Sequence, residues 1–170
     1  DALDKGIDRS NEHDTDHERM EALEWVVQSC QPSPDQDDIT TAAWGHAGVQ
    51  LMRFCLQHRL DDCAAQLASA LTDADAARTI TLTHDTRQEA LRTLWWQANL
   101  PAVATLADCG LAAAGSAPDT AIERARYLEA QADVFWALGQ PDDAENAYLA
   151  ALQNLRTAAQ TAMARRRLGR

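Results

Sequence analysis

Apolar side chains recur along most of the chain at intervals of three or four residues, the spacing of one face of an α-helix. The first such run places Leu23 and Val27 on one face. Before it, Thr15 and Glu18 have the spacing of a capping box, in which each side chain satisfies a free backbone amide at a helix start. The pattern predicts a helix over 15–30.

Two further runs follow a proline pair that stops the first helix. One extends over 38–57, with Leu51 and Phe54 on its apolar stripe, and the next begins at Asp61. Residues 72–84 are less regular, because their threonines alternate with apolar residues as in a short strand. A single strand would have no partner, so we predict a loop or a frayed helix end there.

The second half of the chain has clearer helix boundaries. A helix is expected from Asp85, a short one from Pro101 to near Gly115, and another from about 116 to 138. Pro141 opens the last helix directly after a glycine, and this order of glycine and proline is typical of a tight helix-to-helix turn. The pattern therefore predicts an all-α chain of about seven helices.

The chain also resembles itself 81 residues later. Gln50 to Phe54, followed by an aspartate pair, recurs as Gln131 to Phe135, again followed by an aspartate pair. A fixed-period recurrence of this kind is typical of stacked helical hairpins.

Residues 125–158 resemble a tetratricopeptide repeat. The matching positions, apolar on the first helix and small or aromatic on the second, are Leu128, Ala132, Phe135, Leu138, Gly139, Ala144, Tyr148 and Ala151. The resemblance implies a right-handed α-solenoid of antiparallel helical hairpins, with weaker units near 44–77 and 84–117. We expect a single domain over 15–170, preceded by an acidic, flexible lead over 1–14.

Packing explains the residue types of this unit. Small side chains at Ala144 and Ala151 allow the two helices to approach, whereas Phe135 and Tyr148 are expected to fill the space between adjacent hairpins.

The resemblance also implies a concave binding surface, lined by the first helix of each unit. The corresponding positions here are Arg92, Trp95, Arg126, Glu129, Asp133 and Trp136. Exposed tryptophan and arginine commonly anchor protein partners. We therefore expect a non-enzymatic protein-protein interaction module that binds a protein or peptide segment. The alternative is a ligand- or peptide-sensing regulatory domain of a larger bacterial protein, such as a transcriptional activator.

Charge narrows the range of partners. The 170-residue chain has a net charge of −11, so direct binding to nucleic acid is disfavoured. It contains no apolar run long enough to span a membrane. Residues 1–38 carry 12 acidic and 3 basic side chains, whereas 156–170 carry 5 arginines and no acid. These opposite ends suggest weak head-to-tail self-association.

Candidate catalytic and metal-binding groups are few. The cysteines Cys30, Cys55, Cys63 and Cys109 lack the close spacing of zinc sites, so we expect reduced, buried thiols and a cytoplasmic location. His13 and His17 lie four residues apart among acids, and a hydrolase that uses the 13–18 cluster is a third possibility. The aspartate pairs at helix starts fit capping. We predict no enzyme activity, no cofactor and no metal.

Overall fold

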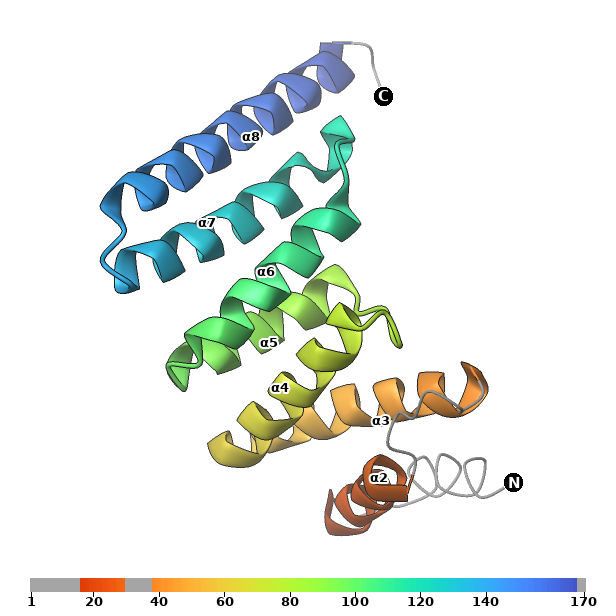
Figure 1. Ribbon diagram of the computed structural model, residues 1–170. Coiled ribbons are helices and arrows are strands. Elements are labelled where there is room, and N and C mark those ends of the chain that lie inside the picture. Colours follow the sequence, from red (N-terminus) through yellow and green to blue (C-terminus); the bar gives the residue numbers. More distant parts are fainter. Residues whose placement is uncertain (1–15, 30–37, 168–170) are drawn as a thin grey trace. The chain divides into compact units, whose positions relative to one another are not determined.

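The structure, a computed structural model, describes residues 16–29 and 38–167. In this part of the chain the backbone forms seven α-helices and one 3-10 helix, with no strand (Figure 1). The prediction of an all-α chain of about seven helices is confirmed. The helices are α2 (Asp16–Ser29), α3 (Asp38–Gln57), α4 (Asp61–Ala76), α5 (His84–Trp96), α6 (Leu100–Ala114), η1 (Pro118–Thr120), α7 (Ala121–Ala137) and α8 (Pro141–Arg167).

The helices fall into two compact units, α2 to α5 and α6 to α8, with the division after Gln97. The single domain expected over 15–170 stays a prediction, and the lead over 1–14 lies outside the described residues. None of the described helices combines the length and apolarity that a bilayer crossing requires.

In the first unit each helix packs on the next one along the chain, α2 on α3, α3 on α4 and α4 on α5. Large buried side chains from all four helices build its core: Val26, Trp44, Met52, Leu71 and Leu94. The indole nitrogen of Trp44 donates a hydrogen bond to the carbonyl of Val27 at 3.2 Å, which satisfies a donor that burial removes from water.

The sequence predicts that the aromatic residues Trp25, Trp44 and Phe54 belong to the core, but two of the three are not fully buried. Trp25 is 44% exposed, because Ala22, Leu23 and Val26 form the buried side of α2. Phe54 is half-buried and stacks on His58 with ring centroids 4.2 Å apart. Of these residues, only Trp44 has the core position expected for it.

The irregular stretch predicted over 72–84 begins later than expected. Helix α4 continues through Ala76, and residues 77–83 form a loop without a strand. The chain leaves the helix through Arg78, whose φ of 59° is in the left-handed region. Thr79 then donates its hydroxyl to the carbonyl of Ala74 at 2.9 Å, which holds the start of the loop against α4.

In the second unit α6 packs on α7 and α7 on α8. Helices α6 and α7 approach closely at Gly110, where an added Cβ would lie closer than 3.0 Å to the ring of the buried Tyr127. Arg124 ties the turn before α7 to the hairpin. Its guanidinium donates to the carbonyls of Gly115 and Ala117 at 3.0 and 2.7 Å and to the Asn154 side chain at 2.8 Å.

The α7–α8 hairpin has the turn expected at Leu138 and Gly139. Gly139 adopts a φ of 72°, which a residue without Cβ accepts readily, and the amide of Gln140 donates to the Phe135 carbonyl at 2.9 Å. Ala144 and Ala151 are buried, as expected for small residues between two helices.

The aromatic residues of this hairpin are only partly buried. Phe135 is half-buried, and Tyr148 is 37% exposed, so Tyr148 lies at the surface of its own unit. Its hydroxyl donates a hydrogen bond to the carboxylate of Asp133 on α7. Tyr148 thus connects α8 to the side of α7 that carries the predicted binding residues.

The expectation of four buried thiols is only partly met. Cys55 is buried, whereas Cys63 and Cys109 are partly exposed, and none of these three is in a disulfide. Cys30 lies outside the described residues. Within the described residues no three histidine, cysteine or acidic side chains converge on a possible metal position. The side chains of His13 and His17 are not among those described.

Candidate functional site

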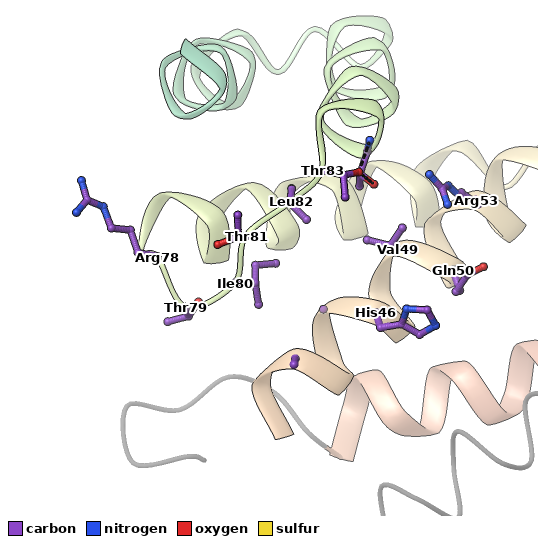
Figure 2. A pocket seen from close by; sticks show the side chains of 13 residues that line it. His46, Val49, Gln50, Arg53, Arg78, Thr79, Ile80, Thr81, Leu82 and Thr83 are labelled. Atoms are coloured by element: carbon purple, nitrogen blue, oxygen red, sulfur yellow. Dashed lines mark hydrogen bonds between the residues drawn. The ribbon is translucent and has the colours of Figure 1, made fainter. Parts of the chain in front are cut away.

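The first unit contains a cavity of about 600 Å³ between α3 and the α4–α5 loop (Figure 2). Helix α3 contributes His46, Val49 and Arg53, and the loop contributes residues 78–83. The side chain of Ile80 lies on the side of the loop that faces α3. It can approach α3 closely because the helix carries Gly45 there, where an added Cβ would lie 3.2 Å from Ile80 Cγ2. A volume of this size is within the range of small-ligand sites.

A buried ion pair fixes the loop that forms one wall of this cavity. Arg87 on α5 donates to both carboxylate oxygens of Asp75 on α4, from Nε at 2.7 Å and from Nη2 at 2.9 Å. The same carboxylate accepts a hydrogen bond from the backbone amide of Leu82 at 3.1 Å. Because both side chains are almost fully buried, the pair depends on this complete set of hydrogen bonds.

The start of α5 also faces this cavity. The hydroxyl of Thr83 accepts a hydrogen bond from the backbone amide of Thr86 at 3.3 Å, which caps the helix. Threonine hydroxyls alternate with aliphatic side chains along the loop, so the wall offers both hydrogen bonds and apolar contact. Arg78 extends away from α3 (Figure 2), which leaves Arg53 and His46 as the basic groups on the α3 side.

A second cavity of about 520 Å³ lies in the same unit, where α5 meets the α3–α4 turn. Arg92, one of the predicted binding residues, lines it together with Glu89 and Trp96. Glu89 accepts a hydrogen bond from Arg53 at 2.7 Å, so one ion pair connects the walls of the two cavities.

The two adjacent tryptophans of α5 have different surroundings. Trp95 is 40% exposed and does not line either cavity, whereas Trp96 is 85% exposed and lines the second one. Adjacent residues on a helix point about 100° apart, so only one of the two shares a face with Arg92 and Glu89. The predicted binding residue is Trp95, whereas Trp96 is the tryptophan that lines a cavity together with Arg92.

The four other predicted residues lie on α7, in the second unit. Arg126, Glu129, Asp133 and Trp136 are three or four residues apart and form one stripe along the helix. Trp136 is 67% exposed, Arg126 and Glu129 are exposed, and Asp133 is half-buried. Ile122, 50% exposed, extends the stripe toward the start of α7.

Tyr148 borders this stripe from α8. The hydrogen bond that its hydroxyl donates to Asp133 stabilises the protonated phenol and raises the pKa of Tyr148 to about 12. The tyrosine therefore keeps its proton across the physiological range, and Asp133 is held at one edge of the stripe.

No protein-family model matches this chain, and neither a curated protein nor a solved structure matches it. The resemblance to a tetratricopeptide repeat thus depends on the sequence pattern, which is specific over 125–158 and weaker elsewhere.

Together, the six predicted residues divide into two faces. Arg92 and Trp95 belong to the first unit, and the stripe of four on α7 belongs to the second. Both faces carry charged and aromatic side chains.

Proposed function

We propose that this chain is a non-enzymatic interaction module that binds a protein segment along α7. The observation that carries the proposal is the stripe of Arg126, Glu129, Asp133 and Trp136, which presents a tryptophan two-thirds exposed beside charges of both signs. Tryptophan and arginine are the residues most enriched at the energetic centres of protein interfaces.

The stripe also indicates the chemistry of the partner. Glu129 and Asp133 lie one turn apart and form a negative patch that fits a basic side chain. The indole of Trp136 fits an apolar or aromatic side chain near the C-terminal end of α7. A partner segment with a basic residue followed by an apolar one would complement the stripe.

The proposal includes a stacked, tetratricopeptide-like arrangement. The match over 125–158 and the sequential packing of helices within each unit support it. In such a stack α7 is the first helix of its hairpin, so its exposed stripe would line the concave face.

The test is a titration of the purified chain with its partner, identified by crosslinking and mass spectrometry. Replacing Trp136 or Arg126 with alanine should each weaken binding by at least about tenfold, since interface anchors of these types contribute about 2 kcal/mol or more. Helix content by circular dichroism should stay the same, because both side chains are exposed. Unchanged affinity in both variants would remove α7 from the binding surface.

A second candidate function is ligand or peptide sensing within a larger regulatory protein. The cavity between α3 and the α4–α5 loop favours it, because its size and its mixed hydroxyl and aliphatic wall suit a small ligand. A ligand whose binding is unaffected by the α7 variants would place the activity in the first unit and support this second function.

A further inference from the structure

One side of α8 carries an exposed apolar stripe. Leu149, Leu152, Leu155 and Met163 are 55%, 52%, 47% and 60% exposed, and their spacing places them within one third of the helix circumference. This exposure is unusual, because large apolar side chains normally form the buried side of a helix.

The side of α8 that faces α7 is made of small residues instead. Ala144, Ala147 and Ala151 are buried there, so α8 contributes little large apolar surface to its own hairpin. Within the second unit, the described residues leave the stripe of three leucines and Met163 open to solvent. A contiguous apolar face of this kind is typical of an interaction surface.

The charges at the two ends of α8 indicate what covers the stripe. The helix begins with Asp142, Asp143 and Glu145 and ends with Arg165, Arg166 and Arg167, and all six are exposed. On or next to the stripe side of α8 lie Asp142, Glu145, Arg166 and Arg167, whereas Asp143 and Arg165 lie on another side of the helix. If a second α8 lies antiparallel and crosses near Leu155, Asp142 of one copy is close to Arg167 of the other, and Glu145 is close to Arg166.

We propose that a second copy of this chain covers the stripe, through antiparallel pairing of the two α8 helices about a two-fold axis. The pairing buries the leucines of both copies and brings each acidic helix start against a basic helix end. Parallel pairing would instead place like charges together at both ends.

The size of the surface sets the strength of this dimer. A helix of 27 residues is about 40 Å long and, at a width of about 10 Å, presents on the order of 400 Å² per copy. This is about half of the roughly 800 Å² per partner of a standard stable interface. We therefore expect a weak, concentration-dependent dimer.

Sedimentation velocity over a range of concentrations at low salt tests the pairing. The chain should reach a dimer and no larger species, because a two-fold interface is closed, whereas the head-to-tail contact expected from the chain ends would extend further. Leu152→Glu should weaken the dimer at least about tenfold. Leu138→Glu is the matched control, since Leu138 is 57% exposed but lies at the α7–α8 turn, outside the stripe.

Charge reversal tests the antiparallel direction. A variant with Asp142→Lys and Glu145→Lys and a variant with Arg166→Glu and Arg167→Glu should each remain monomeric alone and pair when mixed. A wild-type chain that stays monomeric, grows beyond a dimer, or dimerises equally well with Leu152→Glu would overturn the proposal.

A second inference rests on an independent observation, the close approach of two thiols. Cys55 Sγ near the end of α3 and Cys63 Sγ in the first turn of α4 are 2.8 Å apart. The turn between them is tight, with the amide of Leu60 donating to the Cys55 carbonyl at 2.8 Å. The hairpin therefore holds two free thiols in contact.

We infer that Cys55 and Cys63 form a reversible disulfide bond with each other. The oxidant is a small-molecule disulfide, such as oxidised glutathione. The Cys63 thiolate attacks one oxidant sulfur, breaking the oxidant S–S bond and releasing one thiolate. Cys55 then loses its proton and attacks Cys63 Sγ, breaking the mixed disulfide and releasing the second thiol. Two protein thiols are oxidised, and one disulfide is reduced to two thiols.

The surroundings determine the order of these steps. Cys63 is partly exposed and can meet the oxidant, whereas Cys55 is buried. Burial, followed by the hydrogen bond and charge of Cys63, raises the pKa of Cys55 to about 12, so Cys55 is a poor first nucleophile. Leu56 and Asp61, which line the second cavity, are close to the two cysteines in the sequence. A disulfide between the cysteines would therefore restrict movement of this cavity wall.

Peptide mapping by mass spectrometry after incubation with oxidised glutathione tests the pair. The folded chain should yield a Cys55–Cys63 linked peptide. Cys55→Ser should instead retain glutathione on Cys63, Cys63→Ser should form no intramolecular bond, and Cys109→Ser should behave as the unmodified sequence. A folded chain in which glutathione stays on Cys63 without transfer to Cys55, or in which Cys109 joins either residue, would contradict the inference.

Discussion

Replacing Asp75 with alanine should lower the free energy of unfolding by about 3–5 kcal/mol, because it leaves the Arg87 guanidinium buried without its carboxylate. The pair is almost fully buried, with side-chain exposures of 6% for Arg87 and 3% for Asp75. The amide of Leu82 also loses its acceptor, which releases the loop from α4. Urea denaturation followed by circular dichroism measures the change.

The Arg53–Glu89 pair is the matched control. It has the same 2.7 Å distance, but its side chains are 37% and 35% exposed. Glu89→Ala should therefore cost only about 0.2–1 kcal/mol, as for other solvent-exposed pairs. Equal decreases in the free energy of unfolding for Asp75→Ala and Glu89→Ala would mean that the Asp75–Arg87 pair is not buried away from water.

Gly110→Ala should destabilise the second unit by about 3 kcal/mol, the upper part of the usual range for overpacking. The new methyl group would lie closer than 3.0 Å to three ring carbons of Tyr127, and the ring is only 1% exposed and cannot withdraw into solvent. Helix α6 would have to separate from α7.

The sign of this change is decisive. Helix propensity alone would make alanine about 1 kcal/mol more favourable than glycine inside α6. A variant that is as stable as the unmodified chain, or more stable, would show that α6 and α7 do not approach at Gly110. The thermal midpoint of the variant distinguishes the two outcomes.

Helix positions could be predicted from the sequence because the signals that determine them are local. The apolar period of three to four residues, together with Pro101, Gly139 and Pro141, predicts helices close to those observed. The end of α4 within 72–84 was not predictable from the sequence, because no glycine or proline marks it. Its end is fixed by Asp75, whose partner Arg87 is 12 residues away across a loop.

The candidate site was predictable only in part. Arg126, Glu129, Asp133 and Trp136 share a stripe because their spacing alone places them on one helix face. On α5 periodicity alone does not decide between Trp95 and Trp96, since the register depends on which side packs against α4; Trp95 was predicted from the family resemblance. The cavity wall at 78–83 was not predictable, because a tertiary ion pair holds that loop.

The exposed side of α8 has a similar explanation. Periodicity predicts that Leu149, Leu152 and Leu155 share a face, but it does not say whether that face meets α7. The structure places the alanines on that contact, because small side chains let the helices approach more closely. Exposure of the leucines follows from this tertiary arrangement.

The most direct test of the proposed binding surface compares two tryptophan variants in a calorimetric titration with the purified partner. Trp136→Ala should weaken binding at least about tenfold, whereas Trp25→Ala should leave it unchanged, because Trp25 is also exposed, at 44%, but lies on α2 in the other unit. Equal affinity of both variants and the unmodified chain, or a loss confined to Trp25→Ala, would contradict the claim that α7 binds the partner.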